Sequence, residues 1–537
     1  MRKFLLIVFV LCCCPVLLFA QFKDCWVFVP ASVSSESVSN YWGNQVQGYT
    51  EWFNAYAIEH LAENWNAESA PFQVDSLRCY ASEILLIDDI AAQAHSDSIS
   101  LDTSIAFTEY AQISMLQGEL FTRRGWTGKG VTIGVLDAGF LGLKEDSTLQ
   151  HLFRNNQIKA TWDFVRKNND VFRASKHGTQ VLSCMAGLDN HNQFGLATDA
   201  NFLLARAEQN YSAYLIRESR WIEALEWCVK QGAQIVTSSL IFSDQLFKRA
   251  EMNGQSLLSQ AAEKAWERGV LVLNSAGNSG EGYWEIIGAP SDAEHVLTVG
   301  ACSYNGLKSD FSSIGPTADY RMKPNVVALG DVFVSAGNEV EMVSGTSFAC
   351  PMVAGFAACV LQGVPGKRPS DLWLEIQQSA SLYPYYDYAH GFGIPQASYF
   401  ISSQEEDDSA KTNENSIEIK INRVSQNLVE IEVYDNEFSP SQTDSSFVIS
   451  TPQDSMVSLS IEAVSDSVYF QEAPSVDEWM ENPNLMYVHI ENDKGRLEEY
   501  WVIQLEGNSG GMFDVFKYSG HFLRVYYRQR IITYLIE

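Results

Sequence analysis

The sequence predicts an α/β protein whose centre is a doubly wound, mostly parallel sheet with helices on both faces. Short apolar runs have the pattern of buried parallel strands, and segments with apolar residues at three- and four-residue spacing lie between them. Such alternation of strand and helix is typical of a sheet that is covered on both faces. The expected strands are Val131–Leu136, Asn201–Ala207, Gln234–Leu240, Val270–Ala276 and Val296–Val299, and the expected helices are Leu215–Lys230 and Ser256–Arg268.

The α/β part is one segment of a longer chain. We expect a signal peptide, a small N-terminal region, the α/β domain, an acidic linker and a C-terminal β domain at residues 1–20, 21–107, 108–402, 403–415 and 416–537. The N-terminal region has one helical patch from Thr50 to Trp65 and a closing polar stretch from Gln93 to Ser104. In the C-terminal segment Ile417, Ile419 and Ile421 alternate with polar residues, which predicts an all-β, sandwich-like domain.

Residues 1–20 have the pattern of a secretory signal. Arg2 and Lys3 precede an apolar stretch from Phe4 to Phe19, and we expect cleavage after Ala20. A retained anchor is the alternative, but the stretch is short for a membrane span. A lipidated cysteine within Cys12–Cys14 is a weaker alternative, because the small residues that precede such a cysteine are missing. We therefore expect export to the medium, the periplasm or the cell surface, with no membrane span after signal removal.

Composition limits the classes of partner. Of 537 residues, 46% are hydrophobic and 19% are charged, which is the balance of a globular protein. The 36 basic and 66 acidic residues give a net charge of -30, which repels nucleic acid and anionic lipid. Ten cysteines less the three at Cys12–Cys14 leave seven, an odd number whose connectivity stays open. No Cys-x-x-Cys pair and no His-Glu-x-x-His segment occurs, which speaks against a zinc site.

Four chemically active side chains, each near a glycine, follow one another in the order acid, imidazole, amide and hydroxyl. They are Asp137, His177, Asn278 and Ser347, and Asp137 and Asn278 lie just past the ends of expected strands. Active residues of a doubly wound sheet sit at the carboxyl ends of its strands. Nucleophilic acyl transfer requires such a nucleophile, a base, an orienting acid and an oxyanion donor. Alone, each would be read as a helix cap, a surface histidine or a turn residue, but their joint order favours a catalytic set.

Ser347 is expected at the N-terminus of a helix. It lies in Gly345-Thr346-Ser347, and the residues that follow are compatible with a helix up to Pro351. A proline at that point is expected only within the first helical turn. The helix dipole at this end favours developing negative charge.

The motifs resemble those of the subtilisin-like serine peptidases, the subtilases. Residues Gly345–Gly355 match the serine motif of that family at every fixed position, and His177–Thr179 match its histidine motif. The aspartate motif reads Asp137-Ala138-Gly139 in place of Asp-Thr-Gly or Asp-Ser-Gly, and is similar to the Asp-Ala-Gly-Phe form of one group of bacterial secreted subtilases. The resemblance covers roughly Tyr110 to Ser402 and implies a subtilisin-like fold there.

The resemblance also implies a role for each active side chain. Ser347 would be the nucleophile, His177 the base and Asp137 the group that orients the imidazole, while Asn278 would be a donor in the oxyanion hole. The implied activity is that of a serine endopeptidase that acts on proteins or peptides and needs no cofactor for catalysis. The family often binds structural calcium, but no ligands can be placed from the sequence, so calcium stays open.

Two segments resemble walls of the primary specificity pocket of subtilases. Ser239, Leu240 and Ile241 stand where the family commonly has Ser-Leu-Gly, and Ala276-Gly277 should form another wall. A branched side chain at Ile241 in place of glycine should narrow the pocket. We therefore expect a preference for small residues before the cleaved bond.

The N-terminal region resembles, more weakly, the propeptides of secreted subtilases, which assist folding, inhibit the enzyme and are removed by self-cleavage. We expect this region to be an intramolecular inhibitor of a zymogen, with the cut within Gln93–Ser104. An ordinary N-terminal domain is the alternative. Two other functions also stay open for the whole chain, namely a non-catalytic binding scaffold on the same fold and an acyl hydrolase that acts on esters.

Overall fold

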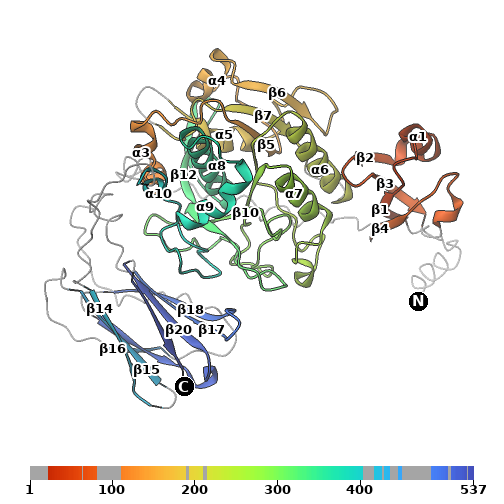
Figure 1. Cartoon of the computed structure of the whole chain (residues 1–537). Coiled ribbons are helices and arrows are strands. Elements are labelled where there is room, and N and C mark those ends of the chain that lie inside the picture. Colours follow the sequence, from red (N-terminus) through yellow and green to blue (C-terminus); the bar gives the residue numbers. More distant parts are fainter. Residues whose placement is uncertain are drawn as a thin grey trace, which may run out of the picture.

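The computed structural model describes residues 22–62, 65–81, 111–188, 193–209, 214–402, 417–425, 428–435, 446–449, 485–505, 509–528 and 530–536. These residues form an N-terminal domain, a central α/β domain and a C-terminal β domain (Figure 1). The expected signal peptide, the polar stretch Gln93–Ser104 and the expected linker at 403–415 lie outside the described residues.

The central domain is built on a seven-stranded parallel sheet, and all the expected strands are confirmed. The strand order is β11-β10-β9-β8-β5-β7-β6, and every neighbouring pair is parallel. The outer strands β6 and β11 have no expected counterpart; β6 is a half-buried edge strand, so its apolar pattern is weak. The strands are β5 Thr132–Asp137, β6 Ile158–Asp163, β7 Asn201–Arg206, β8 Ile235–Ser238, β9 Leu271–Ser275, β10 Leu297–Cys302 and β11 Val326–Leu329.

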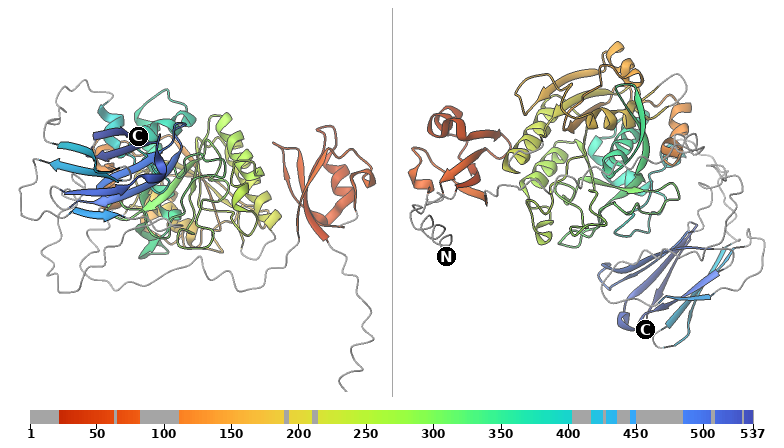
Figure 2. Two further views of the ribbon diagram at one scale, coloured as in Figure 1. Left: turned by 90° about the horizontal axis from the view of Figure 1, so that it is seen from below. Right: turned by 180° about the vertical axis from the view of Figure 1, so that it is seen from behind.

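Helices cover both faces of this sheet, which confirms the doubly wound arrangement (Figure 2). α5 and α8 pack on one face in a cluster that contains Ile133 and Val135 of β5. α6 and α7 pack on the other face in a cluster that contains Leu136. Successive strand residues thus serve opposite cores, which is why β5 is apolar almost throughout. The helices are α3 Gly118–Arg123, α4 Gln150–Arg154, α5 His177–Ala186, α6 Tyr214–Lys230, α7 Leu257–Glu267, α8 Thr346–Gly363, α9 Leu372–Gln378 and α10 Ala397–Ser402.

α8 is the central helix of the domain. A hairpin of β12 (Asp331–Ala336) and β13 (Glu339–Ser344) leads directly into it. Among the described helices, α8 alone is long and apolar enough to cross a membrane, with a mean hydropathy of 1.4, but 78% of that window is buried inside the protein. Its apolar character is therefore that of a core helix.

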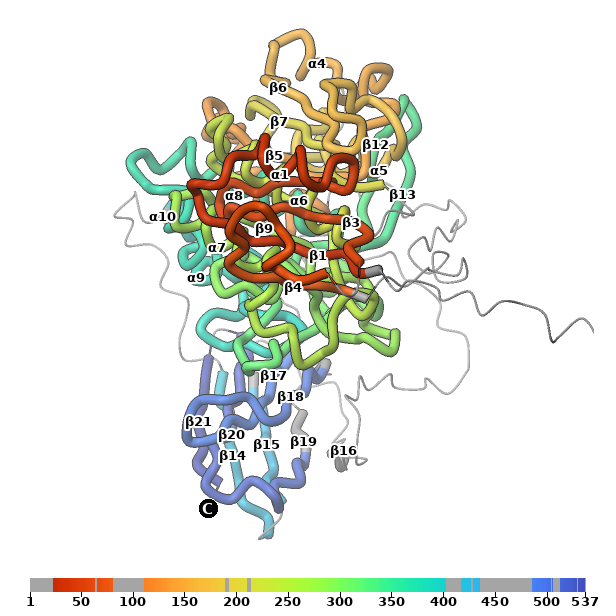
Figure 3. The backbone as a smooth tube through the Cα atoms, turned by 90° about the vertical axis from the view of Figure 1, so that its right-hand side faces the viewer, coloured from red at the N-terminus to blue at the C-terminus, as the bar shows by residue number. Residues whose placement is uncertain are grey.

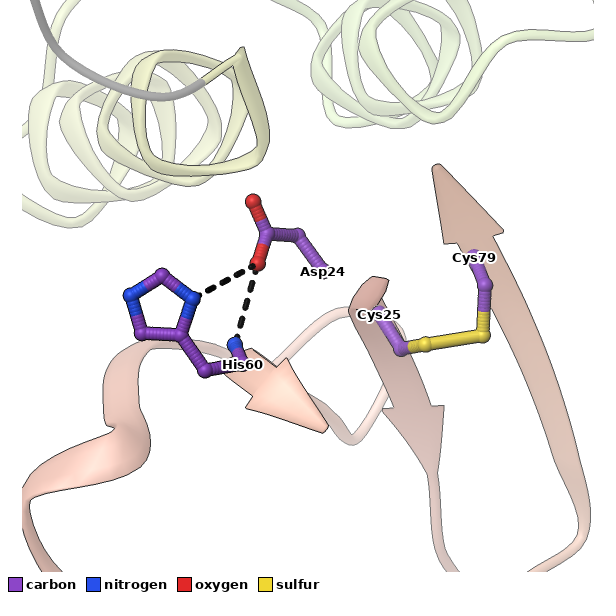
Figure 4. The surroundings of a disulfide bond; sticks show 4 residues. All are labelled: Asp24, Cys25, His60 and Cys79. Atoms are coloured by element: carbon purple, nitrogen blue, oxygen red, sulfur yellow. Dashed lines mark hydrogen bonds and ion pairs between the residues drawn. A yellow bond between two sulfur atoms is a disulfide. The ribbon is translucent and has the colours of Figure 1, made fainter. Parts of the chain in front are cut away.

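The N-terminal domain is a four-stranded antiparallel sheet, in the order β2-β3-β1-β4, with helix α1 beside it. A disulfide joins Cys25 of β1 to Cys79 of β4 (Figure 4). Next to it, the backbone N–H of His60 donates to Asp24 at 3.0 Å. The other five cysteines of the described chain are unpaired and buried. The elements are β1 Phe22–Phe28, α1 Ser35–Trp42, β2 Val46–Thr50, β3 Ala55–Ala62 and β4 Ser76–Ala81.

The helical patch expected from Thr50 to Trp65 is wrong, because Ala55–Ala62 form strand β3. β3 lies between β1 and β2, and both of its faces are covered. Tyr56 and Ile58 pack inside the N-terminal domain, whereas Ala55 and Ala57 pack toward α6. A strand that is buried on both faces carries apolar residues at consecutive positions, and over a short run this pattern cannot be told from that of a helix.

The N-terminal sheet lies against α6 and α7 of the central domain (Figure 3). The indole N–H of Trp26 and the hydroxyl of Tyr80 donate to Oε2 of Glu218 on α6, at 2.9 and 2.8 Å. Glu223 and Glu226 lie about one and two turns beyond Glu218 on α6. Both accept hydrogen bonds from the segment at the end of β2. A row of carboxylates on α6 therefore holds the N-terminal domain.

The C-terminal domain is a pair of four-stranded sheets, β14-β15-β19-β16 and β18-β17-β20-β21, as the alternating pattern predicts. Their inner faces share one core, to which Val429 and Ile431 of the first sheet and Val488 and Val525 of the second contribute. The phenol of Tyr526 donates to a carbonyl of the central domain at 2.9 Å. The strands are β14 Ile417–Arg423, β15 Leu428–Asp435, β16 Ser446–Ile449, β17 Leu485–Glu491, β18 Leu497–Gln504, β19 Ser509–Asp514, β20 Phe522–Tyr527 and β21 Arg530–Leu535.

Candidate active site

The candidate residues gather at the carboxyl ends of adjacent strands. Asp137 is the last residue of β5, rather than just past its end as expected, and it is fully buried. β5 lies between β7 and β8, which end at Arg206 and Ser238. Asn278 follows β9, the next strand along, as expected. The sheet thus brings residues from distant parts of the chain to one edge, as is usual for this architecture.

Two glycines bring the acid and the histidine together. The backbone N–H of Gly178 donates to the carbonyl of Gly139 at 3.0 Å, which joins the loop after Asp137 to the first turn of α5. A methyl group at Gly139 would lie 2.1 Å from the carbonyl oxygen of Arg173, and one at Gly178 would lie 2.4 Å from that of Gly139. Any other residue would force the two backbones apart. The glycines of both motifs are therefore required by the close approach of these segments.

His177, the first residue of α5, is paired with Asp137. Nδ1 of His177 lies 2.9 and 3.0 Å from the two carboxylate oxygens, so it carries the proton and leaves Nε2 as the free acceptor. Burial lowers the pKa of His177, but the charge of Asp137, its hydrogen bond and the charge of Glu208 together raise that pKa above its ordinary value. The arrangement stabilises a protonated imidazole, which is what a general base becomes after it has taken a proton.

Arg206 and Asp163 form a buried ion pair that holds the backbone next to Asp137, and sequence reasoning missed both. The buried guanidinium of Arg206 donates to the carbonyl of Ala138 at 3.1 Å and to Asp163 at 2.8 Å. The residue after Arg206 donates its backbone N–H to the carbonyl of Asp137 at 2.9 Å. A charged residue at the end of an apolar strand, next to the strand of the acid, is the signal that could have indicated this support.

Ser347 is the second residue of α8, and this confirms its expected place at a helix N-terminus. The ring of Phe348, which follows it, lies 5.5 Å from the ring of His177. The expected place of Pro351 is wrong, because it is the sixth residue of α8 and lies in the second turn. Proline has no N–H, so the carbonyl of Ser347 lacks the α-helical donor four residues later. Instead, the hydroxyl of Ser239 donates to that carbonyl at 2.9 Å.

Asn278 is held in one orientation by Thr346, a neighbour of Ser347 to which the sequence assigned no role. Oδ1 of Asn278 accepts the backbone N–H of Thr346 at 3.0 Å and its hydroxyl at 2.7 Å. An N–H group can only donate, so the atom that it faces must be the carbonyl oxygen. These two bonds use Oδ1 of Asn278 and leave its NH₂ group available, and the residue is exposed. Such an amide is free to donate to a bound group.

The expected pocket residues lie near one another, at different depths. Leu240 and Ala276 are buried, so their side chains belong to the core. Ile241 is half-buried and lies against two glycines: a methyl group at Gly277 would stand 3.8 Å from Cγ2 of Ile241, and one at Gly288 would stand 2.6 Å from it. Gly277 has a φ of +109°, a conformation that suits glycine.

Within the described parts of the chain, no group of three or more His, Cys, Asp or Glu side chains is placed to hold a metal ion. Calcium therefore stays an expectation of the family resemblance, without a site.

Known proteins match the central part of this chain. The sequence model of the Subtilase family matches residues 128–395, which lie within the expected 108–402 domain. An alkaline protease of Alkalihalobacillus alcalophilus is 30% identical over 296 residues, which cover 52% of this chain and 68% of the relative. The chain belongs to the subtilase family. Serine protease AprX of Bacillus subtilis (strain 168) is 29% identical over 278 residues, 46% of this chain, but the match spans only 60% of its own length.

A solved structure, that of the prenylagaramide maturation protease PagA, is 22% identical and has a TM-score of 0.44. Its match covers 54% of this chain and 98% of the other. The matched proteins are proteases by name, AprX a serine protease, and the family model matches only within the central domain of this chain. The N-terminal and C-terminal domains lie outside residues 128–395.

Proposed function

We propose that this chain is a secreted serine endopeptidase that hydrolyses peptide bonds through an acyl-enzyme on Ser347. The observation that carries the proposal is the pairing of Asp137 with Nδ1 of His177 at 2.9 and 3.0 Å. The pair lies at the same edge of the sheet as Asn278, which is bonded to the first residue of α8. A serine hydroxyl is a poor nucleophile until a base removes its proton, and a histidine held in this tautomer is such a base.

In the proposed reaction, Oγ of Ser347 attacks the carbonyl carbon of the cleaved bond as Nε2 of His177 takes its proton. The carboxylate of Asp137 stabilises the imidazolium through Nδ1–H. His177 then gives the proton to the leaving amine, and the C–N bond breaks. A water molecule, deprotonated by the same imidazole, hydrolyses the acyl-enzyme and restores the hydroxyl of Ser347.

Asn278 is proposed as the oxyanion donor, together with the backbone N–H of Ser347. The proposal is supported by the two bonds from Thr346 that fix Oδ1 of Asn278 and so leave its NH₂ group as an oriented donor. A donor that is already oriented needs no reorganisation when negative charge develops. Loss of one such donor lowers turnover by about 10²- to 10³-fold.

The N-terminal domain is proposed to be the inhibitory propeptide of a zymogen, and export by the N-terminal signal is part of the same proposal. Support comes from the hydrogen bonds that Trp26 and Tyr80 donate to Glu218 and from the apolar packing of Ala55 and Ala57 against the central domain. Apolar contacts together with directed hydrogen bonds are typical of a specific interface between two protein surfaces.

The proposed substrates are proteins or peptides with a small residue before the cleaved bond. Ile241 supports this preference, because its branched side chain fills space beside Gly277 and Gly288 that a larger substrate side chain would need.

The activity is tested with Ser347→Ala and the matched control Ser147→Ala, which changes an exposed serine outside the site. We expect the secreted wild type and the control to lose the N-terminal region and to cleave a denatured protein substrate. Ser347→Ala should keep its full precursor mass and cleave nothing. A Ser347→Ala protein that still cleaves, or a wild type that neither matures nor cleaves, would refute the proposal and favour a non-catalytic scaffold.

A further inference from the structure

The residue that carries the proposed nucleophile has a backbone carbonyl that its own helix cannot satisfy. In an α-helix the carbonyl of one residue accepts the N–H of the residue four positions later. For Ser347 of α8 that residue is Pro351, which has no N–H. The proline ring also crowds the carbonyl that it faces.

Ser239 supplies the missing donor from a different part of the chain. Its hydroxyl donates to the carbonyl oxygen of Ser347 at 2.9 Å. Ser239 follows β8, and its neighbours are fixed: the hydroxyl of Ser238 accepts the indole N–H of Trp221 at 2.9 Å and the backbone N–H of Leu240 at 3.2 Å. The donor is therefore carried by a segment that is anchored to the sheet and to α6.

We propose that Ser239 is a positioning residue for Ser347, and that its hydroxyl replaces the amide that Pro351 removes. The inference rests on the proposed function, because it concerns the placement of the nucleophile. The first turn of α8 carries both Oγ and the backbone N–H of Ser347, so one hydrogen bond at its carbonyl fixes both groups. It also ties the nucleophile to the segment that holds Ile241 beside Gly277.

Removal of the hydroxyl should slow the chemical step, since acyl transfer depends on near-attack geometry and a displacement of about 1 Å costs about 100-fold. We expect Ser239→Ala to lower kcat, and the rate of labelling of Ser347 by a small fluorophosphonate, by about 10- to 100-fold. The KM for a short peptide should change much less. A residue that only shapes the substrate pocket would change KM and leave the labelling rate unaltered.

A double-mutant cycle with Pro351→Ala tests the stated cause. Alanine at position 351 restores an N–H that can bond the carbonyl of Ser347, so Ser239→Ala should have little further effect in that background. We expect the loss caused by Ser239→Ala to shrink to less than about threefold, an interaction of the kind that such cycles isolate. An equal loss in both backgrounds would overturn the proposal.

A second pair of variants does not depend on how Pro351→Ala folds. Ser239→Thr keeps a hydroxyl, whereas Ser239→Val has nearly the same shape without one. We expect the Thr variant to label at close to the wild-type rate and the Val variant to label as slowly as Ser239→Ala, with thermal unfolding measured to show that both are folded. Equal labelling by Thr and Val would refute the role of Ser239 alone, whereas a wild type that does not label would refute the proposed function itself.

Discussion

The carboxylate of Asp137 meets Nδ1 of His177 with both oxygens, at 2.9 and 3.0 Å. Asp137 is fully buried, while the imidazole is partly open to solvent on its other side. The carboxylate side of the pair is therefore shielded from solvent, while the imidazole stays accessible. This suits a general base, because the acid fixes the ring and Nε2 can face a substrate.

Glu208 should set part of the pH dependence of activity. The pKa of His177 is raised by Asp137 and further by the charge of Glu208, and only the neutral imidazole can act as the base. Activity should thus rise with pH through this raised pKa. Glu208→Gln removes a negative charge that raises the pKa of His177, so the acid limb of kcat/KM should move to lower pH. An unchanged or upward-shifted limb, with Glu418→Gln as the remote control, would contradict this.

Docking of the N-terminal domain should weaken as pH rises. Glu223 accepts the backbone N–H of Tyr49. Burial raises the pKa of Glu223 to about 7, and the charge of Glu226 also raises this pKa. The bond from Tyr49 and the charges of Lys167 and Arg220 lower it in part. When the domain leaves, the exposed carboxyl returns to a pKa of about 4.3. The docked state therefore binds a proton that the released state loses, so affinity falls between about pH 4.3 and pH 7 and is level above.

Glu223→Gln tests this, because the amide keeps the acceptor and cannot ionise. We expect the self-cleaved wild type to release more N-terminal domain on gel filtration at about pH 8 than at about pH 5, a window that spans both pKa values. In Glu223→Gln, the amount released should vary much less between the two pH values. The same pH dependence in the variant as in the wild type would show that another group is responsible.

Ile241 should decide which residue is accepted before the cleaved bond. Its Cγ2 occupies the space beside Gly288, where a methyl group would stand 2.6 Å away. Ile241→Gly should raise kcat/KM for peptides with Phe at that position by at least about tenfold relative to Ala, which is the scale of discrimination by apolar pockets. A panel of peptides with Ala, Leu, Phe and Lys measures both proteins. Clear preference of the wild type for Phe would contradict the expected narrow pocket.

Arg206 should matter for stability through its buried partner. Arg206→Met leaves the buried carboxylate of Asp163 without its cation, and breaking such a pair costs about 3–5 kcal/mol. The double variant Arg206→Met/Asp163→Leu removes both charges and should recover part of this loss. Urea unfolding in a Ser347→Ala background, which excludes self-digestion, measures the free energies. A double variant less stable than the single would contradict the account.

Much of the central domain could be predicted because its signals are local. The buried strands are continuous apolar runs between turns, and Asp137, His177, Asn278 and Ser347 lie in short glycine-rich motifs. Gly139 shows why such a motif contains glycine: a neighbouring backbone segment comes too close to leave room for a side chain. The motif in the sequence therefore reflects the geometry of the folded site.

The errors have a common physical origin in contacts between distant segments. β3 resembled a helix because the N-terminal core covers one of its faces and α6 the other, which no local pattern reveals. Pro351 was misplaced by one turn because the donor that replaces its N–H, Ser239, is far away in the sequence. Arg206 was missed for the same reason, since its partners are Ala138, which follows β5, and Asp163, the last residue of β6.

The proposed role of Ser347 is tested by whether a fluorophosphonate labels it, and by whether labelling depends on the Asp137–His177 pair. The reagent is applied to the secreted protein, and the labelled peptide is identified by mass spectrometry. We predict one adduct, on Ser347, that is absent from Ser347→Ala and forms at least about 10³-fold more slowly in Asp137→Asn, where the imidazole is no longer held in its working tautomer. Labelling elsewhere, or an unchanged rate in Asp137→Asn, would contradict the account.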